Sequence, residues 1–482
     1  MDLVIENPQI KAKCQIFTPN DIVEKMLDMA GYNVHLWGKK VLENSCGDGQ
    51  ILAAVVKRYI EASKKQRISK KKIKEGLEAD IVAYDIDSDW IDKCKKRLSY
   101  LAASYGILDV SWNIKCKDFL QETIKVDYDF IIGNPPYIAY PDLDEETRKY
   151  VRDNFKTCKK GKFDYCYAFI EKSYKLLANG GTLVYIIPSN MFKNVFASEL
   201  RTLIKADIEQ IYDFPNDKIF TEALVSPAII KVIKGSSSDT LRYIRSVGGK
   251  VQETNIAKRD LSKKWIFDTT SDQGGVRVGD YFRVSSCIAT LLNEAFVIRN
   301  CKIDDKYCYT DKGKIEKGLI KKAVSPKNKK YKKHTEYIIF PYYYDSNGIL
   351  AHYSEQEMEE RYPCALQYLD SFRKKLDARK ADSSAKWYEY GRSQALQNAN
   401  KEMILISSVV SACTNAYLLS EDEIPYSGLY ITPTGNIPLS KLLLQLNSTA
   451  FINHISKVGV CVSGQSKRIT PDDIESFVCN LN

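Results

Sequence analysis

Residues 134–137 read Asn-Pro-Pro-Tyr, a combination that could bind a planar group carrying an amine. The side-chain oxygen of Asn134 and the backbone carbonyl of Pro135 are acceptors, and two acceptors close together can hold an –NH₂ group. The ring of Tyr137 could stack on the planar body attached to that amine. The preceding residues 129–133 are mostly apolar and predict a buried strand, which Pro135 and Pro136 must end. The structural alternative is a turn with a packed tyrosine.

Three acidic residues follow or end other strand-like segments. Glu43 precedes the glycine turn of "LENSCGDG" (42–49), Asp85 ends a strand in "ADIVAYDID" (79–87), and Asp118 stands in "CKDFL" (116–120). In nucleoside-binding sheets an acid at the position of Asp85 typically binds ribose hydroxyls, and Asp118 could accept a hydrogen bond from an adenine amine. Three acids in one crevice suit a ligand with an ammonium or sulfonium group, a ribose and an adenine, whereas they would repel a pyrophosphate. The glycines alone are weak evidence, because the segment is neither GxGxxG nor a phosphate loop, and a bare turn is the structural alternative.

The segments that must position these residues alternate between strand-like and helix-like patterns over 1–240. This alternation predicts an α/β domain with a mostly parallel sheet covered by helices. We expect a helix over 20–32 and one long Lys-rich helix from about 50 to 78. The segment "GSSSD" (235–239) predicts a linker, so that 1–240 forms one domain and 241–482 a second, mixed α/β domain.

Charge is distributed unevenly between these halves. The chain of 482 residues carries a net +10, and residues 1–240 hold 36 basic against 34 acidic residues, which leaves +8 for the remainder. An excess of positive charge suggests a polyanion partner, and a solvated surface is the alternative. The 13 cysteines are scattered without a CxxC pair, which fits a reducing cytoplasm and indicates no zinc ribbon. We expect no signal peptide and no membrane span, because no apolar run approaches the ~20 residues that a span needs.

The motifs and their order resemble those of gamma-class (TaqI-like) S-adenosylmethionine-dependent DNA adenine-N6 methyltransferases of the restriction-modification type. "NPPY" resembles motif IV, "LENSCGDG" motif I, "YDID" motif II and "KDFL" motif III. "CQIFTPNDIVEKML" (14–27) resembles motif X and "KIFTEALVSPAIIKVIK" (218–234) motif VIII. In the C-terminal half, segments 279–298, 387–392 and 442–455 are similar to target-recognition regions of this group. "CIATLLN" (287–293) departs from the usual GI-TG-N segment.

The resemblance implies a Rossmann-like methyltransferase fold, S-adenosylmethionine as the cofactor, and a role for each matching residue. Glu43 would bind the methionine amino group, Asp85 the ribose and Ile86 the adenine face. Asp118 would hold the adenine amine, with Phe119 packing beside it. The other cofactor-binding residues would be Thr18, Ser45, Cys46, Gly47, Asp48, Gly49 and Asn134.

At the target, Asn134 and the Pro135 carbonyl would hold the amine, and Pro136 completes the catalytic segment. Tyr137 would stack on the target base, and Phe220 matches a second stacking aromatic residue. No metal is required. The implied function is site-specific methylation of N6 of a flipped-out adenine in double-stranded DNA, with 241–482 as the target-recognition domain. A separate cognate restriction endonuclease is a possible partner.

Two other functions stay open. One is the same chemistry on another acceptor, an amino group in RNA or a glutamine in a protein. The other, of a different class, is a non-catalytic DNA specificity subunit, which the intact motifs I and IV disfavour.

Overall fold

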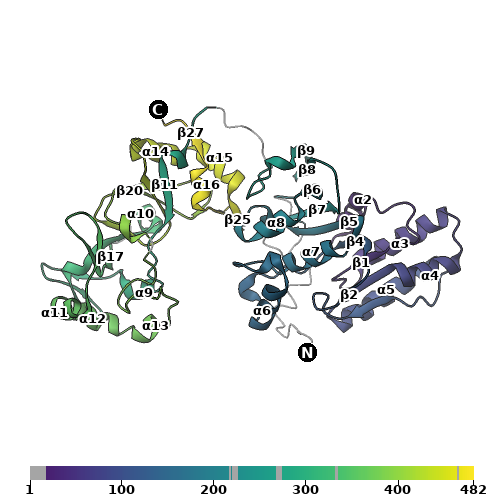
Figure 1. Ribbon diagram of the computed structural model, residues 1–482, viewed down its shortest axis with the longest axis horizontal. Coiled ribbons are helices and arrows are strands. Elements are labelled where there is room, and N and C mark those ends of the chain that lie inside the picture. The colour runs from purple at the N-terminus through teal and green to yellow at the C-terminus, as the bar shows by residue number, and fades with distance from the viewer. Residues whose placement is uncertain are drawn as a thin grey trace. The chain divides into compact units, whose positions relative to one another are not determined.

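The computed structural model describes residues 18–215, 219, 226–267, 274–331, 335–393, 395–463 and 466–481. The chain divides into two compact units, Met1–Phe267 and Asp268–Asn482. Both mix helices and strands (Figure 1), as the α/β prediction requires.

A nine-stranded sheet forms the centre of the first unit within the described residues. Its order is β3-β2-β1-β4-β5-β7-β6-β8-β9. Strands β3, β2, β1, β4 and β5 pair in parallel, and β7 and β9 run antiparallel to their neighbours. The bounds are β1 Val41–Glu43, β2 Ile81–Asp85, β3 Asn113–Cys116, β4 Tyr128–Gly133, β5 Leu177–Pro188, β6 Ile208–Asp213, β7 Pro227–Ile233, β8 Thr240–Val247 and β9 Lys250–Ala257.

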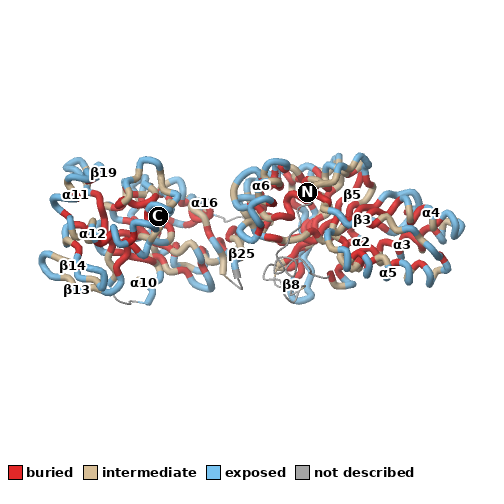
Figure 2. Tube along the Cα trace, turned by 90° about the horizontal axis from the view of Figure 1, so that it is seen from below, coloured by how far each residue is buried: buried red, intermediate tan, exposed pale blue. Residues whose placement is uncertain are grey.

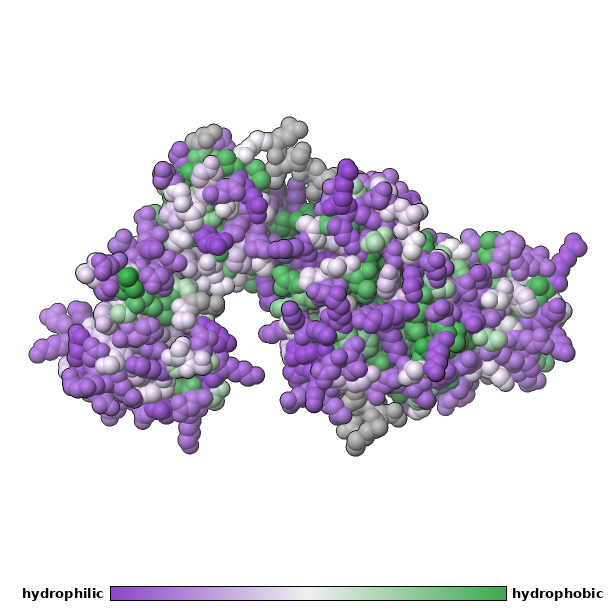
Figure 3. Space-filling view, in the orientation of Figure 1, coloured by the Kyte–Doolittle hydropathy of each residue, from purple (hydrophilic) through white to green (hydrophobic). Residues whose placement is uncertain are grey.

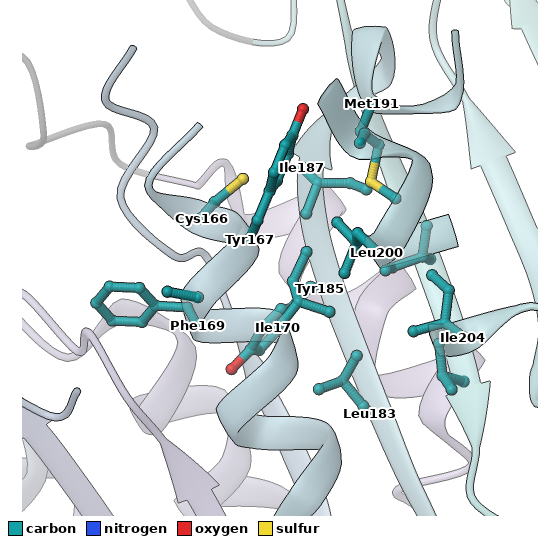
Figure 4. Packing of buried hydrophobic residues seen from close by; sticks show 14 of the residues in the cluster. Cys166, Tyr167, Phe169, Ile170, Leu183, Tyr185, Ile187, Met191, Leu200 and Ile204 are labelled. Atoms are coloured by element: carbon teal, nitrogen blue, oxygen red, sulfur yellow. The ribbon is translucent and has the colours of Figure 1, made fainter. Parts of the chain in front are cut away.

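Helices cover both faces of this sheet. The helices are α2 Asn20–Ala30, α3 Gln50–Lys65, α4 Lys70–Asp80, α5 Ser88–Ser104, α6 Glu145–Asn154, α7 Cys166–Lys175 and α8 Ser198–Ile204. Side chains of β5 alternate between two hydrophobic cores, because successive residues of a strand point to opposite faces. Leu183, Tyr185 and Ile187 join the core with α7 and α8, and Figure 4 shows them against Tyr167 and Ile170. Val184 and Ile186 join the core with α2, α3, α4 and α5.

Two sequence expectations about this unit were wrong. The long helix expected up to residue 78 is two helices, since Arg67 adopts a left-handed backbone (φ 58°) and Ser69 caps α4 by accepting the Lys72 N–H. The boundary expected at 240 lies at 267/268, because "GSSSD" only turns the chain from β7 into β8, which pairs with β6. Strands β8 and β9 therefore complete the first sheet.

The second unit is built around two four-stranded sheets within its described residues. One contains β11 Phe282–Ser286, β24 Leu429–Pro433, β20 Met403–Ile406 and β22 Ala416–Leu419, and the other β12 Val297–Ile298, β17 Glu336–Ile339, β16 Ile320–Val324 and β23 Glu423–Pro425. The other strands are β10 Val276–Arg277, β13 Lys302–Ile303, β14 Tyr307–Thr310, β15 Gly313–Glu316, β18 Tyr342–Tyr344, β19 Leu350–His352, β21 Val409–Val410, β25 Val460–Ser463, β26 Ser466–Arg468 and β27 Val478–Cys479. Its helices are α9 Asn293–Phe296, α10 Pro326–Tyr331, α11 Glu355–Arg361, α12 Pro363–Asp370, α13 Arg373–Asp377, α14 Leu439–Leu446, α15 Thr449–Val458 and α16 Pro471–Glu475.

Burial follows this division into units. Figure 2 shows buried residues in the interior of each unit and exposed residues on the outer sides of helices such as α4 and α6. No helix in the described part of the chain is both long enough and apolar enough to cross a bilayer.

Candidate active site

The glycine turn after β1 is fastened to the end of the neighbouring strand β2. The Gly47 N–H donates to Asp85 Oδ2 at 2.8 Å, and the Cys46 N–H donates to the Tyr84 carbonyl at 3.0 Å. Gly49 has φ 81°, and a Cβ there would lie 2.4 Å from the sulfur of Cys94 on α5. The turn therefore needs glycine both for its backbone conformation and for close packing on α5.

Glu43, the last residue of β1, is buried with one oxygen unpartnered. The residue is 2% exposed, and Oε2 makes no hydrogen bond within the described residues. Burial raises the pKa of the Glu43 carboxyl well above its ordinary value, and the nearby Cys94 and Asp85 add to the rise. A buried, unpaired acceptor is costly unless a ligand supplies the missing donor. The arrangement fits a positively charged amino group.

Asp85, the last residue of β2, accepts hydrogen bonds from two backbone N–H groups and can still accept one from a ligand. Its Oδ1 accepts the Asp87 N–H at 3.0 Å while Oδ2 accepts that of Gly47. Burial raises the pKa of Asp85, and these backbone donors oppose the rise. Each carboxylate oxygen has a second lone pair, so a hydroxyl can still bind here. Asp87 caps α5 instead, and Ile86 between them is 43% exposed, as an apolar ligand-binding face would be.

The loop after β3 carries Asp118 and is bonded to Lys172 of α7. Asp118 accepts the Leu120 N–H at 2.8 Å and the Gln121 side-chain amide at 2.9 Å. Lys172 on α7 donates to the carbonyls of Phe119, Leu120 and Glu122 at 2.5, 3.0 and 2.6 Å. Burial lowers the pKa of the Lys172 ammonium to about 8. One lysine thus fixes the loop that carries Asp118.

The Asn-Pro-Pro-Tyr segment follows β4 and is bonded to two other predicted segments. Asn134 Nδ2 donates to Thr18 Oγ1 at 3.2 Å, and the Ser45 hydroxyl donates to the Asn134 backbone carbonyl at 3.0 Å. The Tyr137 hydroxyl lies within hydrogen-bonding distance of Asn134 Oδ1 and of the Ile186 carbonyl. An amide oxygen has two lone pairs, so Asn134 Oδ1 can accept more than one donor.

The structure thus brings Thr18, Ser45 and Asn134 together, and separately joins Gly47 to Asp85. Asp48 forms an ion pair with Arg97 of α5. Phe119 is in the hydrophobic core, where its ring packs on Tyr84 and Phe169 with centroids 5.7 Å apart in each case.

The other residues predicted for the site differ in how far they are buried. Cys46 and Pro135 are buried, and Pro136 is half-buried. Phe220 lies outside the described residues. Among the described residues, no group of three or more His, Cys, Asp or Glu side chains could hold a metal ion.

Two supporting features could not be found from sequence. One is Lys172. The other is a buried polar network in which the Asn44 amide donates to Ser173 Oγ (2.9 Å) and to the Tyr185 hydroxyl, with Ser173 and Tyr185 2.7 Å apart. These residues come from the end of β1, α7 and β5, so no local spacing links them.

The family comparison identifies the segment that carries this site. Residues 33–220 match the family model described as Eco57I restriction-modification methylase. The resemblance to restriction-modification methyltransferases is confirmed. The matched segment begins after α2 and includes β1 to β6, hence the glycine turn and the Asn-Pro-Pro-Tyr segment.

Curated relatives are similar over part of their length. The Type II methyltransferase M.HincII of Haemophilus influenzae is 29% identical over 234 residues, which are 48% of this chain and 39% of that protein. The Type II restriction enzyme and methyltransferase RM.Eco57I of Escherichia coli is 24% identical over 341 residues, 61% of this chain and 33% of that protein. The chain therefore matches less than half the length of these relatives.

A solved structure shares the fold. The Type IIL restriction-modification enzyme MmeI, determined in complex with DNA, matches with a TM-score of 0.56 and 13% identity. The match covers 95% of this chain and 64% of that chain. At this identity the likeness concerns the fold alone.

Proposed function

We propose that this protein is a site-specific DNA methyltransferase that uses S-adenosylmethionine to methylate N6 of adenine. The observation that carries the proposal is the bonding of Asn134 to both Thr18 and Ser45, which joins three motifs at one place. Ser45 is two residues after Glu43, whose buried Oε2 has no hydrogen-bond partner among the described residues. The family match and the relatives named as Type II methyltransferases support the transferase class. Adenine as the target rests on the Asn-Pro-Pro-Tyr segment.

The residues around β1 and β2 fit the cofactor. Glu43 Oε2 would accept from the amino group, Asp85 from the ribose hydroxyls, and Ile86 would cover the adenine. Asp118, held by the loop that Lys172 fixes, would bind the adenine amine. S-adenosylmethionine supplies a methyl group activated by its positively charged sulfur.

The residues after β4 would prepare the target nitrogen. The adenine amine is conjugated with its ring and is a poor nucleophile. Accepting its protons at Asn134 Oδ1 and the Pro135 carbonyl would favour a pyramidal nitrogen with a free lone pair. Within the described residues the Pro135 carbonyl accepts no hydrogen bond, so it is available for this role. Positioning and electrostatics then provide most of the catalysis, and no covalent enzyme intermediate is needed.

A base inside a duplex must leave the stack to reach this segment, which costs ~a few kcal/mol. Stacking on the half-buried ring of Tyr137 would offset that cost by ~1–3 kcal/mol.

We propose that the second unit binds and reads the duplex. We propose a separate restriction endonuclease as a partner of this chain. The relative RM.Eco57I is named as both restriction enzyme and methyltransferase, which places the two activities in one protein there.

The test is transfer of labelled methyl groups from S-adenosylmethionine to three acceptors offered in parallel: duplex DNA, total RNA and a protein extract. We expect label in DNA, and N6-methyladenine after its digestion to nucleosides. Label in RNA or protein alone would favour the alternative acceptors. Tight cofactor-independent DNA binding without transfer would favour a specificity subunit.

A further inference from the structure

A short segment of the first unit concentrates positive charge. Residues 148–162 contain seven lysine or arginine residues and one aspartate, although residues 1–240 as a whole are nearly neutral. The segment runs from α6 through the turn η2 (Lys156–Cys158) towards α7. Five of the basic side chains are exposed, and we call them the α6 basic surface: Lys149, Lys156, Lys159, Lys160 and Lys162.

These lysines form few ion pairs. Within the described part of the chain, the single ion pair of the α6 basic surface joins Lys156 to Glu199, at 3.6 Å. The space-filling view of this unit shows the surface around α6 as hydrophilic (Figure 3). Exposed like charges repel one another, and a polyanion that approaches them relieves that repulsion.

The basic segment is joined to the chain that leaves the Asn-Pro-Pro-Tyr segment. Ala139, two residues after Tyr137, forms an antiparallel bridge with Asp164, and the Tyr165 N–H donates to the Ile138 carbonyl at 3.0 Å. The basic segment therefore ends two residues before this bridge.

The N-terminal end of the basic segment contacts the residues that follow Tyr137. The guanidinium groups of Arg148 and Arg152 lie 5.2 and 5.1 Å from the ring centre of Tyr140, three residues after Tyr137. Both ends of the segment thus flank the site proposed for the target base. This geometry distinguishes the α6 basic surface from lysine runs elsewhere in the unit.

An exposed apolar pair borders the same surface. Val195 is 48% and Phe196 38% exposed, and the Phe196 ring lies against Gly161, where a Cβ would be 2.0 Å from it. Gly161 stands between Lys160 and Lys162. Basic side chains interleaved with an exposed aromatic ring are typical of surfaces that contact nucleic acids.

We propose that the α6 basic surface binds the phosphate backbone of duplex DNA next to the target adenine, so that the catalytic unit contributes its own DNA affinity. The inference rests on the proposed function and names the surface by which this unit holds its substrate. Phosphate contacts position a protein on DNA without reading sequence, so the surface would orient the duplex while base reading takes place elsewhere.

The test compares two triple variants of the full chain. Lys159→Ala/Lys160→Ala/Lys162→Ala removes three of the five lysines of the surface and spares Arg148 and Arg152, which pack on Tyr140. The matched control, Lys70→Ala/Lys71→Ala/Lys72→Ala, removes an equally exposed run from the start of α4. Helix α4 leads into the opposite, N-terminal end of strand β2, and Figure 1 shows α4 and α6 at opposite ends of the unit.

Binding to a mixed-sequence DNA duplex is measured by fluorescence anisotropy at several salt concentrations, with melting temperature and S-adenosylmethionine calorimetry as checks of folding. For the 159–162 variant we expect about tenfold weaker binding at low salt and a salt slope that is smaller by about 0.9 for each phosphate that the variant no longer neutralises. The weakening should be equal for a duplex that contains the methylated sequence and one that does not. The α4 control should bind like the parent protein.

Unchanged affinity and slope in the 159–162 variant, with the parent protein methylating DNA, would overturn this inference and leave the proposed function intact. A weakening of equal size in the α4 control would also overturn it, since the effect would then reflect net charge alone. A parent protein that neither binds nor methylates DNA would remove both proposals.

Discussion

If the amino group of S-adenosylmethionine binds at Oε2 of Glu43, as proposed, cofactor binding is coupled to proton release. Burial raises the pKa of Glu43, so the free protein retains a proton there at pH values at which an ordinary glutamate is ionised. A bound ammonium favours the ionised form, so binding should release a fraction of a proton and the affinity should increase as pH rises through the raised pKa.

Glu43→Gln should abolish this proton release and weaken S-adenosylmethionine binding by about ten- to a hundredfold, the equivalent of a charged hydrogen bond. The measurement is calorimetry in buffers of different ionisation enthalpy, at two pH values. Proton release that persists in Glu43→Gln would mean that another group receives the amino group.

Tyr137 combines a ring with a hydroxyl that contacts Asn134, and the two parts can be separated. Tyr137→Phe keeps the ring and removes only the hydroxyl, which lies within hydrogen-bonding distance of Asn134 Oδ1 and the Ile186 carbonyl. One hydrogen bond is worth about 1 kcal/mol, so transfer should slow about fivefold. Tyr137→Ala also removes stacking, and should slow transfer much further. A fluorescent adenine analogue at the target position should still report base flipping with Tyr137→Phe and not with Tyr137→Ala. Equal slowing in both variants would exclude the stacking role.

At the scale of elements, strand ends and the residues on them are set by local sequence, whereas the contacts that hold them are not. The strand before Asn134 and the glycine turn after Glu43 were predictable because an apolar run followed by Pro or Gly has few other solutions. Lys172, by contrast, bonds to carbonyls 50 to 53 residues away, a relation that depends on how α7 packs. The break after α3 was missed because Arg67 is not a residue that usually adopts positive φ.

The lysine cluster "KKAVSPKNKKYKK" (321–333), which in sequence could contact phosphate or form a solvated loop, shows the same limit within its described residues. Lys322 and Lys329 appear in sequence to be part of a basic cluster available to a polyanion, yet both pair with Glu423, at 2.9 and 2.8 Å. Glu423 is itself 6% exposed. These two lysines therefore stabilise the packing of β16, α10 and β23. Of the exposed lysines in residues 148–162, by contrast, only Lys156 forms an ion pair within the described residues. Sequence alone could not distinguish the two groups.

Lys172 allows a prediction about the loop that it holds. Lys172→Met should leave three carbonyls without their donor and loosen the loop with Asp118, so that S-adenosylmethionine affinity falls by about tenfold, as for removal of a charged hydrogen bond. Lys175→Met on the same helix, where Lys175 is exposed and pairs with Glu171, is the control. Calorimetry is the measurement. A cofactor affinity in Lys172→Met equal to that of the control would show that the loop keeps its shape without this contact.

At the scale of the whole molecule, the extent of the first unit is itself testable. A fragment ending at 240 lacks β8 and β9, and also Trp265, which is 1% exposed and stacks on Phe192. Burial of each large apolar side chain stabilises by ~1.5–3 kcal/mol, so losing several approaches the ~5–15 kcal/mol that hold a domain folded. Fragment 1–267 should therefore melt cooperatively and bind S-adenosylmethionine, and fragment 1–240 should not. Equal melting temperatures would restore the boundary expected from sequence.

The most direct test of the proposed function is a map of modified bases in DNA from cells that express the chain or its Asn134→Ala variant. The parent protein should place N6-methyladenine at one recurring sequence throughout the genome. Asn134→Ala should leave that sequence unmodified, because losing a positioned hydrogen-bonding group of this kind raises the barrier by ~2.7–4 kcal/mol. The variant should still bind S-adenosylmethionine, since the proposed contacts of Glu43, Asp85 and Asp118 with the cofactor remain. Modified cytosine, adenine methylation without a recurring sequence, or an Asn134→Ala variant that retains more than about a tenth of the activity would contradict the assignment of Asn134 to the amine of a flipped adenine.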